Sequence, residues 1–209
     1  WSVILVFAQY FPPKPNVVHF GQKDGLSHRN VRAIVQDEND FLWIGTQYGL
    51  NRFDGKAFKQ FLPDPLNPDA IAALEILEMT YGESGLIWIG FADGRVDAFD
   101  QNTNKFRHFQ ILNQSNGQSP FITVISEFSN GDLFVGTIEG QIYRKPSDLD
   151  TFLHVASMPV LAGPEKKYSD DNRILHISET PSGKAWIVSV ASDWVADLSG
   201  PKPSMNRRI

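Results

Sequence analysis

The residues best placed for chemistry stand directly before glycines that recur along the chain, or in the segments that lead into apolar runs. Tyr48, Asp93 and Glu139 each precede a glycine, and Arg29 and Arg173 lie in lead-in segments. An aromatic ring presents a flat apolar face with a polar tip, and arginine binds anionic groups through a planar fork. We therefore predict a ligand-binding surface formed by these five residues, with a plain solvated face as the alternative.

Acid–base catalysis would need a pair of carboxylates at one special place. Asp54 and Asp100 form the most regular acidic pattern, because each closes an apolar run of the form Phe-Asp. A role that recurs in register favours structure over catalysis, since aspartate at the end of a strand readily forms a turn with its own side chain. No catalytic residue is predicted.

Metal and cofactor sites have no support in the sequence. The chain has five histidines, none in an HxxxH or HxH spacing, and no cysteine, so a thiolate metal site and a cysteine nucleophile are both excluded. Glycine-rich phosphate loops and the nucleophile elbow are also missing. The formal net charge of −5 disfavours a nucleic-acid partner. We expect a protein that is not an enzyme and holds no cofactor.

The elements that must position these residues come from an internal repeat. The aromatic anchors Trp43, Trp88, Phe134 and Trp186 are spaced by 45, 46 and 52 residues. That period suits a propeller blade of four short strands, and no helical periodicity is visible. Each unit holds four short apolar runs separated by turn residues. The predicted fold is all-β, a β-propeller fragment of about four four-stranded antiparallel blades.

Glycine follows the anchor by two positions in three of the units, as Gly45, Gly90 and Gly136, whereas Val188 takes this place in the fourth. Glycine inside a strand indicates close approach by another element, here the neighbouring blade. We assign residues 20–64, 65–111 and 112–160 to three blades, 161–200 to a degenerate fourth, and 201–209 to an irregular tail. Residues 1–8 are interpreted as the end of a truncated signal peptide and 9–19 as a linker.

Residues 31–61 closely resemble the two-component regulator propeller repeat. The resemblance rests on Gly25-Leu26-Ser27, Val31 to Asp37, Leu42 to Thr46, and Gly49 to Gly55. The second unit matches well and the third acceptably, so the resemblance covers roughly residues 20–190.

This resemblance implies a function. Such repeats form the periplasmic sensor of hybrid two-component histidine kinases, often with polysaccharide fragments as signals. It implies a location on the periplasmic or extracytoplasmic side of a bacterial inner membrane. The implied partners are an oligosaccharide, further blades, downstream signalling domains and a second copy in a dimer. The alternatives are a secreted propeller enzyme acting on polysaccharide and a protein-binding propeller without a small ligand.

Overall fold

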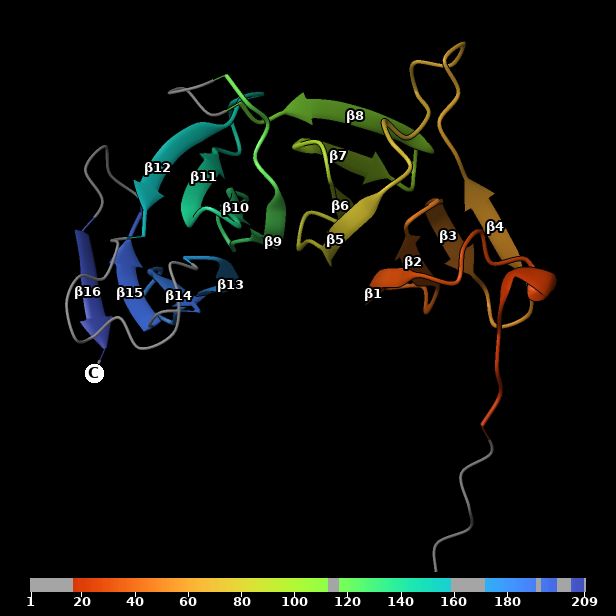
Figure 1. The fold of residues 1–209 in the computed structure, drawn as a ribbon, viewed down its shortest axis with the longest axis horizontal. Coiled ribbons are helices and arrows are strands. Elements are labelled where there is room, and N and C mark those ends of the chain that lie inside the picture. Colours follow the sequence, from red (N-terminus) through yellow and green to blue (C-terminus); the bar gives the residue numbers. More distant parts are fainter. Residues whose placement is uncertain (1–16, 113–116, 159–171, 191–192, 199–203, 209) are drawn as a thin grey trace, which may run out of the picture.

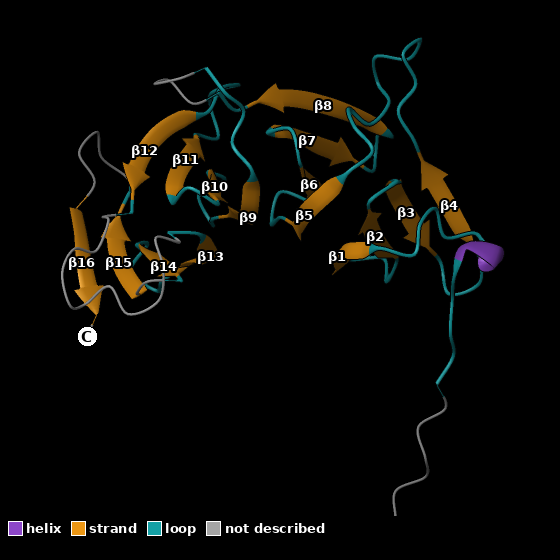
Figure 2. Ribbon diagram, in the orientation of Figure 1, coloured by secondary structure: helices purple, strands orange, loops and turns teal. Residues whose placement is uncertain are grey.

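The computed structural model describes residues 17–112, 117–158, 172–190, 193–198 and 204–208. They form four antiparallel sheets of four strands, each built from strands consecutive in the chain. The all-β propeller architecture predicted from the repeat is confirmed (Figures 1 and 2). A short 3-10 helix at Gln22–Asp24 precedes the first sheet. The strands are β1 (Val31–Gln36), β2 (Leu42–Thr46), β3 (Gly49–Phe53), β4 (Phe58–Phe61), β5 (Ile76–Tyr81), β6 (Leu86–Phe91), β7 (Arg95–Asp100), β8 (Lys105–Gln110), β9 (Ile122–Glu127), β10 (Leu133–Thr137), β11 (Gln141–Lys145), β12 (Leu153–Ser157), β13 (Ile174–Glu179), β14 (Ala185–Ser189), β15 (Asp193–Asp197) and β16 (Ser204–Arg208).

The four sheets stand side by side as an arc (Figure 1). The first strand of each sheet, β1, β5, β9 or β13, lies on the inner side of the arc, and the fourth strand lies on the outer side. The arc does not close into a ring. We call the sheets blades 1 to 4 in chain order.

The aromatic anchors point from each blade towards the next one. Trp43 of blade 1 packs with Ile76 and Met79 of blade 2, and Trp88 of blade 2 packs with Ile125 of blade 3. Phe134 of blade 3 lies in the cluster that extends into blade 4. The sequence repeats because each blade must bury the same apolar face against its neighbour.

The glycines beside these anchors lie where the blades approach most closely. A Cβ on Gly45 would lie 2.6 Å from Ile76 Cγ2, and one on Gly90 would lie 2.7 Å from Ile125 Cδ1. Neither distance leaves room for a side chain. Val188 occupies the corresponding position in blade 4. It faces the side of that blade on which the described residues form no further blade. The change from glycine to valine therefore has a physical reason.

Glutamates at the ends of two inner strands hold adjacent blades together. Glu127 of blade 3 accepts hydrogen bonds from Ser84 Oγ at 2.9 Å and from the indole Nε1 of Trp88 at 3.2 Å, both in blade 2. Glu179 of blade 4 accepts from the amide and hydroxyl of Ser129 in blade 3, at 2.8 and 2.9 Å. These bonds fix the register between blades at the end of the arc that carries the first hairpin turns.

The irregular tail predicted at 201–209 is wrong, because β16 (Ser204–Arg208) pairs with β15 and completes blade 4. Met205 packs against the core of that blade, which gives this short polar strand an apolar contact. The strands of the first three blades fall inside the ranges predicted for them. Residues 1–16, which carry the predicted signal-peptide end and most of the linker, lie outside the described residues.

Candidate functional site

The turns between second and third strands share one end of the arc with the loops that lead into the first strands. Backbone hydrogen bonds join the two sets of segments within and between blades: Gln47 N to Asn30 O, Gly49 N to Leu74 O, Ala92 N to Glu75 O, Ile138 N to Phe121 O, and Val190 N to Arg173 O, at 2.8 to 3.2 Å. We call this end the turn face.

The five predicted ligand residues lie on the turn face but are spread along it. Arg29 and Tyr48 belong to blade 1, Asp93 to blade 2, Glu139 to blade 3 and Arg173 to blade 4. All are exposed except the half-buried Arg173. The structure places Tyr48 and Asp93 on either side of residues 73–75, while Glu139 and Arg173 belong to separate blades further along the arc. Their role in binding stays a prediction.

Asp54 and Asp100 form turns, the structural role favoured by the sequence. Asp54 Oδ1 accepts the amides of Lys56 and Ala57 at 2.9 and 2.8 Å. Asp100 Oδ1 accepts the amide of Asn102 at 2.8 Å. Backbone hydrogen bonds lower the pKa of both carboxyl groups, which keeps them ionised as acceptors.

Sequence reasoning missed a polar cluster in blade 2 beside the loop 62–75. Asp97 is fully buried; its carboxylate contacts His108 Nδ1 at 2.7 Å and accepts the amide of Ala72 at 2.8 Å. The other ring nitrogen of His108 lies 2.9 Å from the carbonyl oxygen of Pro68. His108 thus links a buried carboxylate to the loop. The sequence around His108 does not indicate this role, because its partners Asp97 and Pro68 lie 11 and 40 residues away in the chain.

Arg95 and Asp93 form the exposed continuation of this cluster. Arg95 donates to Asp93 Oδ2 from Nε at 2.8 Å and from Nη2 at 2.6 Å, and its Nη1 donates to the carbonyl of Ala72 at 2.5 Å. Burial opposes ionisation of Asp93, but the hydrogen bonds from Arg95 outweigh it and lower the pKa of Asp93. Asp93 is thereby held as a carboxylate in a fixed orientation.

The electrostatics of the buried pair differ from those of the exposed pair. Burial raises the pKa of Asp97, even though the hydrogen bond to His108 opposes the rise. For His108, burial favours the neutral ring, but the hydrogen bonds to Asp97 and Pro68 outweigh it and raise its pKa. The contact between Asp97 and His108 is therefore strongest when the imidazole is protonated.

Two hollows adjoin this cluster on the turn face. One, of about 320 Å³, is lined by Ala73, Leu74, Glu75, Ala92 and Asp93. The other, of about 430 Å³, is lined by Pro63, Asp64, Pro65, Asn67, Pro68, Ala70, Ile71, Ala72, Arg95 and His108. Both volumes lie within the range of small-molecule sites. The loop 62–75 and the start of β7 therefore form a concave surface with mixed apolar and polar walls.

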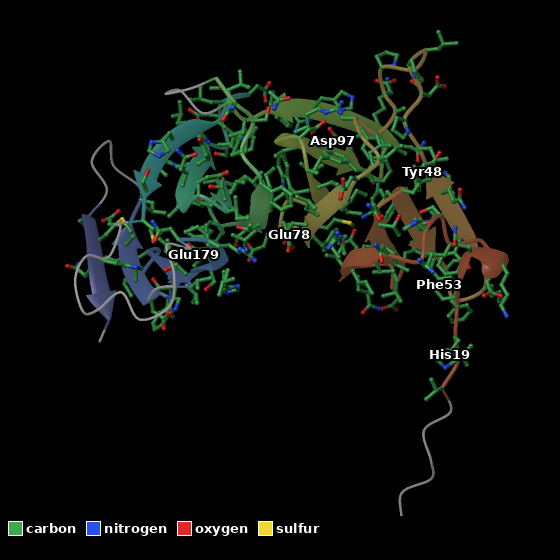
Figure 3. All side chains as sticks on the ribbon, viewed as in Figure 1. His19, Tyr48, Phe53, Glu78, Asp97 and Glu179 are labelled. Carbon is green, nitrogen blue, oxygen red and sulfur yellow. The ribbon has the colours of Figure 1, made fainter. Side chains whose placement is uncertain are left out.

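The inner side of the arc holds one further perturbed group. Glu78 of β5 lies opposite Gly90, on the face of blade 2 that packs against blade 3 (Figure 3). Burial raises the pKa of Glu78 from 4.5 to about 7. The folded chain therefore holds this proton more tightly than the unfolded chain does.

We expect Glu78→Gln to stabilise the protein at pH 8 and to change little near pH 4. The raised pKa makes the wild-type protein lose stability as the pH rises through 4.5 to about 7. Full conversion of the shift gives about 3 kcal/mol, and partial exposure reduces the expected gain to about 1–2 kcal/mol. Urea unfolding at both pH values measures the difference. Glu83→Gln, at an exposed turn, is the control, and an equal gain at pH 4 and pH 8 would contradict the assignment.

Two further features concern the part of the chain that the structure describes. There, no three side chains of His, Cys, Asp or Glu gather in a group suited to a metal ion. The helices described also include none with the length and hydropathy needed to cross a bilayer.

The radial stacking of four-stranded sheets, with ligand-sized hollows between turn and lead-in loops, defines a β-propeller repeat protein. Residues 25–48 match the two component regulator propeller family, which confirms the resemblance seen in the sequence. A stretch of 49 residues is 45% identical to a histidine kinase of Formosa agariphila; it covers 23% of this chain and 4% of the kinase.

Solved structures show the same fold. The extracellular domain assigned to a hybrid two component system of B. thetaiotaomicron superposes with a TM-score of 0.69 at 23% identity, over 92% of this chain and 26% of that one. A virginiamycin B lyase from Staphylococcus aureus superposes with a TM-score of 0.60 at 12% identity, over 85% of this chain and 54% of the lyase. The chain thus carries a two-component regulator propeller repeat and shares the fold of the extracellular domain of a hybrid two component system, of which it spans about a quarter.

Proposed function

We propose that this chain is an extracytoplasmic ligand-sensing propeller module of a two-component signalling receptor. In this proposal it binds a carbohydrate-like ligand on the turn face and transmits the signal to a histidine kinase outside this chain. The observation that carries the proposal is the hollow lined by residues 73–75 and by the oriented carboxylate of Asp93. The exposed Tyr48 directly precedes Gly49, whose amide donates to the carbonyl of Leu74 in the same segment. The similarity to extracellular domains of hybrid two component systems supports the location on the periplasmic side.

The chemistry of this hollow suits binding better than turnover. The carboxylate of Asp93 is neutralised by Arg95, and that of Asp97 is enclosed by His108 and the Ala72 amide. A general acid or base needs a proton site within reach of the substrate. The exposed carboxylate of Asp93 can instead orient a ligand by accepting hydrogen bonds from its hydroxyl groups.

Tyr48→Ala is expected to weaken binding of an oligosaccharide by about tenfold while leaving stability nearly unchanged. The side chain is 50% exposed, so its removal costs little packing, but the ligand loses an aromatic face. A thermal-shift screen with neutral oligosaccharides first identifies the ligand, because a ligand that binds only the folded state raises the Tm. Titration calorimetry then compares the variants.

Tyr48→Phe serves as the matched control, since it keeps the ring and removes only the hydroxyl. Its affinity should remain within about threefold of that of the wild type, because the ring face supplies most of the contact. Equal affinity of the alanine variant and the wild type would remove Tyr48 from the site. Absence of any shift across the whole panel would contradict the carbohydrate-sensing proposal and favour a protein-binding propeller.

A further inference from the structure

We propose that the ligand site has two compartments, one on each side of the Asp93–Arg95 ion pair, and that it selects an uncharged oligosaccharide over an anionic one. This inference rests on the function proposed above and adds the length and the charge class of the ligand. It comes from the way in which the loop 62–75 is fixed against blade 2.

The Asp93–Arg95 ion pair, which separates the two compartments, is held rigidly. Asp93 lines the hollow of about 320 Å³, and Arg95 lines the hollow of about 430 Å³. Two nitrogens of Arg95 donate to the same oxygen of Asp93, and the third donates to the carbonyl of Ala72. All three guanidinium nitrogens are engaged, so the pair has a fixed position with one side towards each hollow. A bidentate or forked ion pair of this kind adds geometric specificity as well as energy.

The outer compartment, on the Arg95 side, is held open by the loop itself. The second half of the loop is attached to β8: Asp69 O accepts the amide of Phe106 at 3.2 Å, and the Asp69 carboxylate pairs with Lys105 at 2.8 Å. The first half closes on itself, because Asp64 Oδ1 accepts the amide of Leu66 at 3.0 Å. The hollow lies beside both halves and therefore exists without a ligand, which reduces the entropic cost of binding.

The division predicts a ligand of several sugar rings. Each hollow alone lies in the lower part of the size range of small-molecule sites. Ala72 lines one hollow and Ala73 the other, so the two hollows adjoin consecutive residues of the loop. A monosaccharide would occupy one compartment, whereas an oligosaccharide would extend across the ion pair into the second and gain contacts in both.

The charges around the hollows determine which glycans can enter. Asp93 and Asp69 are each neutralised by a basic partner, and the buried Asp97 is paired with His108. Asp64 lines the outer hollow and Glu75 the inner one, and the ion pairs found in the described part of the chain include neither. The lining is therefore net negative. Carboxylate oxygens accept bonds from sugar hydroxyls but repel uronate or sulfate groups.

The test is calorimetric titration of the full chain with gluco-, manno- and xylo-oligosaccharides of one to six rings, and with oligogalacturonides of the same lengths. The affinity for one of the neutral series should rise at least tenfold from one ring to four and then level off. Oligogalacturonides should bind at least tenfold more weakly than the best neutral ligand. The double variant Asp64→Asn, Glu75→Gln should narrow that difference at least fivefold, because it removes the two carboxylate charges of the lining that have no ion-pair partner among the described residues.

Two features make the test decisive. Asparagine at position 64 keeps the acceptor oxygen for the Leu66 amide, so the loop is preserved when its charge is removed. Glu83→Gln removes one exposed charge from the opposite end of blade 2 and should leave the discrimination unchanged. Equal affinity for one ring and for four, or a preference for oligogalacturonides, would overturn the two-compartment inference while carbohydrate sensing stands. If no glycan binds, the proposed function fails, and this inference fails with it.

Discussion

Replacing Gly136 by valine is expected to destabilise the contact between blades 3 and 4 by about 3 kcal/mol, the upper end of the usual cost of overpacking a core. A Cβ at position 136 would lie 2.7 Å from Cβ of Ile174 in blade 4 and 2.7 Å from Cγ1 of Val124 in its own blade. Both neighbours are β-branched and therefore stiff at χ1, so they cannot rotate away. The strands themselves must separate.

Because blades in a repeat array stabilise their neighbours, the damage should appear locally. Amide protons of β13 to β15 should lose hydrogen-exchange protection in Gly136→Val, while those of β5 to β8 keep it. Val188→Gly is the matched control, because it makes the reciprocal change at the same register on a flank without a described neighbour. Its expected cost is about 1 kcal/mol or less, the price of glycine in a strand. Unchanged protection of β13 to β15 in Gly136→Val would show that the glycine is not required for blade packing.

The propeller architecture was predictable because each blade must bury the same apolar face against its neighbour. The anchors Trp43 and Trp88 recur with the glycine two positions later, since both residues face the next blade across the same short distance. A pattern that occurs three times at a nearly constant period identifies the repeat even where single positions differ between units. The fourth strand of blade 4 escaped prediction because Ser204–Arg208 is short and polar, and the half-buried Met205 alone makes no apolar pattern.

The sequence predicted which end of the blades carries the candidate site, but not the residues that meet there. The turn glycines and the lead-in segments of the repeat place Tyr48 and Asp93 at the same end of the arc. Arg95, Asp97 and His108 were missed because they become neighbours of the loop 62–75 only through tertiary contacts. Repeats reveal what the blades share, whereas this cluster is a feature of blade 2. The strand registers show which residue of blade 1 corresponds to Asp97. It is Asn51, because both residues pair with an isoleucine on the second strand of their blade.

Replacing Asp97 by leucine is expected to cost about 3 kcal/mol and to release the loop 62–75 from blade 2. The carboxylate is fully buried, and its loss leaves the Ala72 amide and the His108 ring without their acceptor. Breaking a buried ion pair and leaving buried donors unsatisfied are among the largest single-residue effects. Limited proteolysis should then cut within the loop, and thermal unfolding should occur at a lower temperature. An intact loop and an unchanged Tm would show that Asp97 does not hold this segment.

Asp97→Asn separates the hydrogen bond from the charge. Asn51 performs the same task in blade 1, where its Oδ1 accepts the amide of Ser27 at 2.9 Å. An asparagine side chain at position 97 should therefore cost about 1 kcal/mol or less.

The raised pKa of His108 means that the stabilising contribution of this residue is fully present below pH 6.5 and is lost as the pH rises through the folded-state pKa. Wild-type loop protection should therefore decline as the pH rises above 6.5. In Asp97→Asn this decline should be much smaller, because the buried charge that favours the imidazolium has been removed, and an equal decline in both proteins would assign the pH dependence to another group.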